Sequence, residues 1–278
     1  MQLTRRGRLL VTISVVVVLV VAGAFALTRT PLGSALGLGT EPPCTLTTAD
    51  DEVEWSTAQA MTATTVAGVG TRIGATENGV AAAVRRAMLV ERDAPLPVDE
   101  AREIYRNLPD VARPGAEALA MARALLGRRG PALTCVVPLS AGEGLPAEEP
   151  GRLGLTPRGD TTRLAMRAVF GPQSLGGFEP EGVSTGHIEG SAHYEGRAID
   201  VFFRPITAES TAAGWQQAMW AVAHAERLEL ATIIFARRIW TASRSVQGWR
   251  GYQHPGGETD NPVLLHEDHV HIDVHRGG

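Results

Sequence analysis

The first strongly patterned segment is an uncharged, apolar stretch at 9–27 that follows three arginines near the amino terminus. A stretch of this length can cross a bilayer as one helix, and the arginines would remain on the cytoplasmic side. The small residues at 24–26 also fit the cleavage site of a secretory signal. We therefore predict that residues 1–27 are a signal anchor or a signal peptide. Both interpretations place the rest of the chain outside the cytoplasm, either held at the cell membrane or secreted.

Residues 28–43 are rich in Pro, Gly and small side chains, which is typical of a flexible tether. Beyond them, apolar residues recur at helical spacing in four segments, 55–74, 78–93, 97–108 and 113–130. The third segment opens with Pro and acidic residues, and the fourth runs from a Pro to a Gly with arginines near its end. We predict an all-α domain over 44–139.

The pattern changes after a segment rich in Gly, Pro and Glu at 140–156, which we interpret as an interdomain linker. Helical spacing returns at 161–171 and 211–230, whereas strand-like runs occur at 197–205, 231–240 and 268–275. This mixture predicts an α+β domain over 157–278 with a small, mainly antiparallel sheet.

Charge narrows the possible partners. The formal net charge is −4, whereas a nucleic-acid binder would need a basic stripe to release counterions. We therefore expect no nucleic-acid partner.

The chain has two cysteines, Cys44 and Cys135, at the two ends of the predicted helical domain. Outside the cytoplasm, such a pair is expected to form a disulfide. We predict a disulfide that staples this domain.

Candidate chemistry is concentrated in two strings of the last hundred residues. The string SAHYEGRAIDVFF at 191–203 sets His193 and Asp200 seven positions apart, just before a strand-like run. The string HEDHVHIDV at 266–274 holds His269 and His271, which a strand would place on one face. If the two strands are neighbours, His193, Asp200 and a terminal histidine converge. Two imidazoles and one carboxylate on Zn²⁺, with the fourth position open, make a hydrolytic site.

The first string matches the pattern S-x-H-x-x-G-x-A-x-D in full, and residues 155–276 resemble the zinc D-alanyl-D-alanine peptidases and the amino-terminal domain of hedgehog proteins. The lysostaphin-type endopeptidases have a similar site. The resemblance implies a hedgehog/DD-peptidase-like fold and the zinc ligands His193, Asp200 and His271. In the lysostaphin-like branch the first histidine of the pair assists catalysis, which points to His269.

Three residues are candidates for the general base. The D-alanyl-D-alanine peptidases carry a glutamate three residues before the last zinc histidine, where this chain has Asp268, and Glu267 lies one residue further back. Strand parity favours Glu267, whereas family spacing favours Asp268. His269 is our first choice, because an imidazole titrates near neutral pH and can accept a proton from water.

Three residues are candidates for substrate contact: Ser191, Arg197 and Trp240. Arg197 could anchor a substrate carboxylate or pair with an acidic neighbour. Trp240, together with Trp249 and Tyr252, could line a groove or pack beneath a loop.

Two further histidines receive structural interpretations. His224 lies beside the apolar face of the helix at 211–230, and we interpret it as a packed side chain. His187 could lie near the metal, but we interpret it as a loop residue.

The helical half has a fainter resemblance of its own. Residues 57–74 and 81–93 are similar to the opening helices of actinobacterial domains related to lytic transglycosylases, in which a glutamate near the position of Glu91 acts as general acid. The Gly-Leu-Phe-Gln stretch that should follow is absent, so we interpret this half as a shortened, non-catalytic module.

Two hypotheses of different class follow. The first is an exported zinc peptidase that acts on peptidoglycan stem peptides as a D,D-carboxypeptidase or endopeptidase. The second is a non-catalytic cell-envelope binding or scaffold module that a metal ion stabilises.

Overall fold

The computed structural model describes residues 43–90, 92–109 and 114–278. The predicted signal or anchor at 1–27 lies outside the described residues, as does Glu91. Among the residues that were described, no helix combines the length and the apolar character needed to span a membrane.

The amino-terminal half contains helices and a small sheet, so the prediction of an all-α domain is wrong. Its elements are β1 (Cys44–Thr47), β2 (Glu52–Trp55), α3 (Thr57–Arg72), α4 (Glu77–Met88), α5 (Val98–Arg106), α6 (Ala116–Leu125) and β3 (Leu133–Cys135). The three strands pair antiparallel in the order β2-β1-β3. Each strand has only three or four residues, too few for a clear alternating pattern between the longer helical segments.

The predicted disulfide is confirmed. Cys44 and Cys135 face each other across the β1–β3 pair, and their sulfur atoms are bonded. Both cysteines are buried in the core. The covalent link therefore closes the sheet between its first and last strands in the sequence.

The carboxy-terminal half is α+β with an antiparallel sheet, as predicted. Its elements are α7 (Pro157–Phe170), β4 (Leu175–Gly176), the 3₁₀ turn η1 (Ala192–Glu195), β5 (Ala198–Phe202), α8 (Ala208–Ala223), β6 (Leu230–Phe235), β7 (Arg238–Thr241), the 3₁₀ turn η2 (Ala242–Gln247), β8 (Arg250–Gly251) and β9 (His269–Val274). The strand order is β4-β5-β9-β6-β7-β8, and every pair is antiparallel. The strand-like run at 231–240 divides into a hairpin, because Ala236 and Arg237 form a turn with positive φ.

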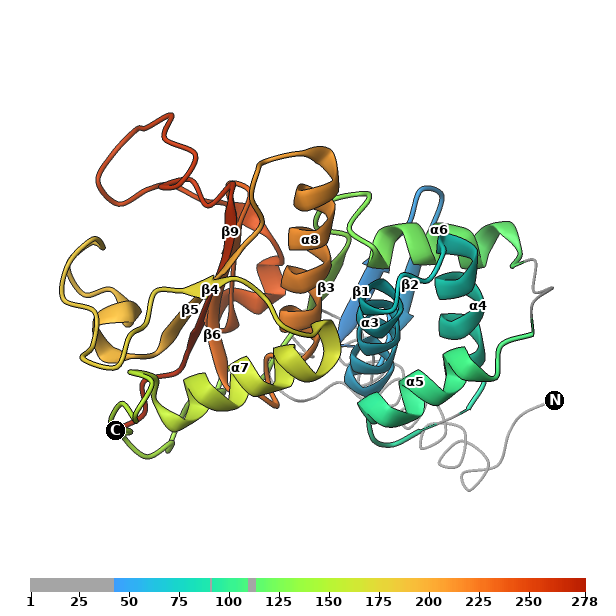
Figure 1. Cartoon of the computed structure of the whole chain (residues 1–278), viewed down its shortest axis with the longest axis horizontal. Helices are drawn as coiled ribbons and strands as arrows, with labels where there is room; N and C mark the ends of the chain where they lie inside the picture. Colours follow the sequence, from blue (N-terminus) through green and yellow to red (C-terminus); the bar gives the residue numbers. More distant parts are fainter. Residues whose placement is uncertain (1–42, 91, 110–113) are drawn as a thin grey trace, which may run out of the picture.

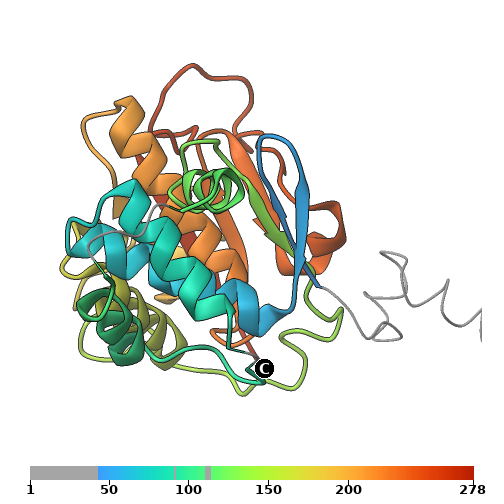
Figure 2. The ribbon, with the colours of Figure 1, turned by 90° about the vertical axis from the view of Figure 1, so that its right-hand side faces the viewer.

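The two halves share one hydrophobic core. Helix α3 lies between the helices of its own half and the helices α7 and α8 of the other, and Figure 2 shows the small blue and green sheet at the edge of the amino-terminal half. Thr71 on α3 donates a hydrogen bond to Gln216 on α8 at 3.0 Å. The indole of Trp249 donates to the carbonyl of Leu133 in β3 at 2.9 Å.

The two faces of the large sheet differ in character. Residues 199, 201, 270 and 272 are apolar and almost fully buried, and α7 and α8 pack against their strands. The alternate positions of β5 and β9 carry Asp200, His269, His271 and Asp273. Because successive side chains of a strand point to opposite faces, the helices cover one face and the polar residues gather on the other.

Candidate metal centre

The local fold of 191–200 explains the spacing of its polar and small residues. Ser191 is the N-cap of η1, and its hydroxyl accepts a hydrogen bond from the backbone N–H of His193. Gly196 ends the turn with φ of 65°, and a Cβ there would lie 2.3 Å from the carbonyl oxygen of Gly154. A glycine is therefore required at this position. The turn places His193 just before β5, so that its side chain lies beside Asp200.

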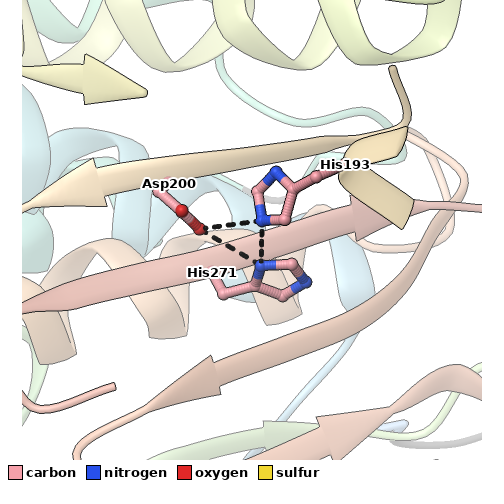
Figure 3. Close-up of side chains that lie close together, drawn as sticks. All are labelled: His193, Asp200 and His271. Atoms are coloured by element: carbon pink, nitrogen blue, oxygen red, sulfur yellow. Dashed lines mark hydrogen bonds and ion pairs between the residues drawn. The ribbon is translucent and has the colours of Figure 1, made fainter. Parts of the chain in front are cut away.

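The register of the β5–β9 pair places the third ligand, His271, beside the other two. Asp200 and His271 are directly opposed across the β5–β9 pair. The Nδ1 of His271 lies 3.1 Å from Oδ1 of Asp200 and 3.1 Å from Nε2 of His193, and the remaining side of the triangle measures 3.4 Å (Figure 3). All three residues are buried, and together they could hold a metal ion.

The size of this triangle fits a small divalent cation. Zinc ligands at 2.0–2.2 Å in a tetrahedron lie about 3.3–3.6 Å from one another. The three separations of 3.1, 3.1 and 3.4 Å are close to this range. The donor set and its spacing therefore fit the predicted metal centre.

Outer contacts orient both histidine ligands. The Nδ1–H of His193 donates to the carbonyl of Gly177 at 2.7 Å, which leaves the Nε2 lone pair for a metal. Gly177 has φ of 78°, and a Cβ there would lie 2.3 Å from the His193 ring. On the other ligand, Nε2 of His271 lies 3.5 Å from Oδ2 of Asp273. This is the histidine–carboxylate arrangement that commonly supports metal sites.

The electrostatics of the cluster favour a cation. Burial opposes ionisation of Asp200, but the adjacent imidazoles of His193 and His271 hold the pKa of its carboxyl far below the usual range. Burial likewise disfavours a charged His271, yet the carboxylates of Asp200 and Asp273 raise its pKa to about 9. The raised pKa of His271 reports the negative charge of these two carboxylates, which a bound metal ion would also experience.

His269 stands beside the triangle without belonging to it. Its Nδ1–H donates to Oδ1 of Asp268 at 2.7 Å, and its Nε2 lies 3.7 Å from Oδ1 of Asp200. The other oxygen of Asp268 accepts a hydrogen bond from Nε of Arg204 at 2.6 Å. Asp268 therefore orients His269, and the free Nε2 of His269 points toward the ligands.

Glu267 lies outside this arrangement. Its carboxylate pairs with the guanidinium of Arg237 at 2.5 Å. The parity argument for Glu267 assumed a strand that includes residue 267, whereas β9 begins at His269. The three candidate bases therefore have different positions. His269 faces the ligands, Asp268 hydrogen-bonds to His269, and Glu267 forms an ion pair with Arg237.

The three candidates for substrate contact have structural partners. Trp240 is fully buried and its indole donates to the carbonyl of Cys135, so the prediction that it lines a groove is wrong. Ser191 caps η1. Arg197 donates to Glu195 at 2.6 Å and to the carbonyl of Val274 at 2.6 Å, so it pairs with an acidic neighbour and joins β5 to the end of β9.

Sequence reasoning missed one histidine at the site, His266. The ring of His266 lies 4.7 Å from that of His269 and 5.6 Å from that of His271, and burial followed by the two neighbouring imidazoles lowers its pKa to about 3. His187 is a loop residue, as interpreted, and it also lies near the ligands, because its ring stacks on His193 with centroids 4.0 Å apart. His266 precedes β9 and has no periodic relationship to the ligands that a sequence could reveal.

The fold and the site define an α+β protein with a buried two-histidine, one-aspartate centre of metal-binding geometry. The family model described as "VldE, C-terminal domain" matches residues 152–263. The match includes His193 and Asp200 and ends before β9. Comparisons with curated proteins and with solved structures gave no match.

Proposed function

We propose that this protein is an exported zinc-dependent peptidase that hydrolyses peptide bonds in peptidoglycan stem peptides. The observation that carries the proposal is the triangle of His193, Asp200 and His271 with a fourth residue, His269, oriented beside it. The family-model match over residues 152–263, which include His193 and Asp200, is compatible with this proposal.

The donor set favours zinc. Two imidazole nitrogens and one carboxylate oxygen suit Zn²⁺ better than Mg²⁺ or Ca²⁺, which prefer all-oxygen ligands. Three protein ligands also leave one tetrahedral position open, as in catalytic zinc sites, whereas structural sites have four protein ligands. Among the described residues, the cluster has three members.

The side chains around the cluster have separate roles in proton transfer. Bound zinc would polarise the scissile carbonyl and lower the pKa of the attacking water. His269 accepts the proton from that water at Nε2 and passes it to the leaving amine. The carboxylate of Asp268 stabilises the imidazolium through the Nδ1–H bond, and Arg204 holds that carboxylate in place.

The substrate class and the location rest on the sequence. The segment at 1–27 favours export, held at the cell membrane or secreted, and the resemblance to zinc D-alanyl-D-alanine peptidases favours stem peptides as substrates. Either a D,D-carboxypeptidase or an endopeptidase fits the centre.

The proposal is tested by incubating the zinc-loaded protein with purified muropeptides and following the products by mass spectrometry. We expect cleavage that stops on chelation and returns with zinc. His269→Ala should retain zinc and lose turnover by about 10²–10⁴-fold, the usual contribution of a general base. His275→Ala, at a position beyond the end of β9, is the matched histidine control. A parent protein that binds zinc and cleaves nothing would favour the non-catalytic, metal-stabilised scaffold.

A further inference from the structure

A cavity of about 770 Å³ lies in the long connection between β8 and β9. Its lining includes Tyr252, Gln253, Glu258, Thr259, Asp260 and Leu265. This volume is within the range of pockets that enclose small-molecule and peptide ligands. The loop that forms it extends from the sheet on the side away from the amino-terminal half (Figure 1).

Both ends of this loop are fixed to the same turn. At the start, the N–H of Tyr252 donates to the carbonyl of Arg237 at 2.9 Å. At the end, the N–H groups of Arg237 and Ala236 donate to the carbonyls of Leu265 and His266 at 3.1 and 2.7 Å. The β6–β7 turn therefore clamps the base of the loop. A fixed base limits how much of the loop must be ordered when a ligand binds, which lowers the entropic cost of binding.

One aromatic ring joins the cavity to the metal centre. Tyr252 lines the cavity and packs edge-on against His266, with centroids 4.9 Å apart. His266 in turn lies 4.7 Å from His269. The rings of Tyr252 and His266 thus lie between the cavity and the proposed base, which places the cavity beside the metal centre.

We infer that this cavity is a substrate subsite, and that Tyr252 is a specificity-determining residue that contacts the peptide on one side of the scissile bond. The inference rests on the proposed function and makes it more specific. Its consequence is a preference for oligopeptides that extend into the cavity over a terminal dipeptide with the same scissile bond. Remote contacts of this kind raise kcat/KM, because their binding energy helps to place the reacting bond.

The lining indicates which peptide groups it accepts. Gln253, Thr259 and the phenol of Tyr252 can each donate and accept hydrogen bonds, as peptide amides require. Glu258 and Asp260 add negative charge, so a peptide segment that carries an amine fits the cavity better than one that adds a carboxylate.

Binding can be tested without turnover. Zinc-loaded His269→Ala protein is titrated by calorimetry with D-Ala-D-Ala and with a stem pentapeptide that ends in D-Ala-D-Ala. We expect the pentapeptide to bind at least about tenfold more tightly. Adding Tyr252→Ala should reduce that ratio to about threefold or less, with zinc content and near-UV circular dichroism retained. Gln253→Ala, at an exposed position, should lower the ratio in the same direction and is the second variant if Tyr252→Ala fails to fold.

Tyr105→Phe is the matched tyrosine control, because its hydroxyl bonds to Val66 on α3, in the other half of the molecule. A protein that binds both probes equally, or neither, overturns the subsite. So does a Tyr252→Ala variant that weakens both probes by the same factor. The proposed function fails separately, if the parent protein cleaves no muropeptide while this binding preference persists.

Discussion

The imidazole of His269 and the carboxylate of Asp268 are joined by a 2.7 Å hydrogen bond although the two residues are neighbours in the chain. Neighbours within a strand point to opposite faces, so this contact requires the strand to begin between them. β9 does begin at His269. The start of the strand therefore creates an orienting pair, and Arg204 holds the second oxygen of the carboxylate.

Asp268→Asn tests this pair. The Arg204 guanidinium can only donate, so the asparagine oxygen must face Arg204 and its NH₂ must face His269. The ring would then carry its proton on Nε2 and lose its ability to act as base there. We expect zinc content to remain and turnover to fall by about 10²–10⁴-fold. Asp160→Asn on α7 is the control. Full activity in Asp268→Asn would exclude an orienting role.

The ligand triangle predicts a simple pattern of metal loss. Alanine at His193, Asp200 or His271 removes one of three ligands, and each dialysed variant should lose the zinc that the parent protein retains. Metal analysis by mass spectrometry measures this directly. Asp273→Asn removes only an outer contact, so its zinc should remain with an affinity about 10–100-fold lower. Stoichiometric zinc in any alanine variant would contradict the assignment of that ligand.

A tyrosine beside the first ligand should tune metal affinity from a distance. The backbone N–H of His187 donates to the hydroxyl of Tyr194 at 3.0 Å, and that hydroxyl donates to the carbonyl of His187 at 2.5 Å. These bonds hold the His187 ring on His193. Tyr194→Phe releases the loop, and we expect zinc affinity in a chelator competition to fall by about tenfold. Tyr105→Phe, which loses a phenol bond elsewhere, should leave that affinity unchanged. Equal affinities in both variants would show that the stacking has no effect on the metal.

Much of the centre could be predicted because its contacts are local or follow strand parity. Ser191, His193 and Gly196 form one turn, and Asp200 lies two residues into the strand that follows it. The parity rule that placed His269 and His271 on one face applies equally to Asp273, which could have been found by the same reasoning.

The remaining features depend on long-range geometry or on unusual backbone. The acceptor for His193 is a main-chain carbonyl, that of Gly177, and no side chain marks it. The β6–β7 turn has positive φ at Ala236 and Arg237 without the Gly or Asn that usually indicates such a turn. Glu267 was a plausible base only while the start of β9 was unknown.

The disulfide should contribute strongly to stability. Cys44 and Cys135 are separated by 91 positions, and closing a loop of that size restricts the unfolded chain by about 4–5 kcal/mol in the entropy model. Replacing both cysteines by serine should lower the free energy of unfolding by up to this amount. Denaturant titration measures the loss, and the reduced parent protein is the matched control. A change below about 1 kcal/mol would show that the β1–β3 pair holds the chain ends equally well without the bond.

His224 predicts how stability varies with pH. Its Nδ1–H donates to the carbonyl of Trp220 at 2.8 Å, its Nε2 faces the hydroxyl of Thr65, and burial lowers its pKa to about 3. Above pH 6.5 the residue is neutral in both states and adds no pH dependence. Below pH 6.5 only the unfolded chain binds the proton, so stability falls by up to about 1.4 kcal/mol per pH unit.

His224→Gln removes this contribution. We expect the metal-free parent protein to lose more stability between pH 6.5 and pH 5 than the variant does, as measured by denaturant titration at each pH. Parallel pH profiles for the two proteins would contradict a buried neutral histidine at this position.

The shared core has a consequence for proteolysis. The segment at 140–156 is largely exposed, and both cysteines lie on its amino-terminal side, so a cut there leaves no covalent link between the two fragments. The contacts of α3 with α8 and of β3 with the Trp240 and Trp249 indoles remain. A nicked molecule would therefore migrate as two bands under denaturing conditions while eluting as one particle from a sizing column, with the metal centre still assembled.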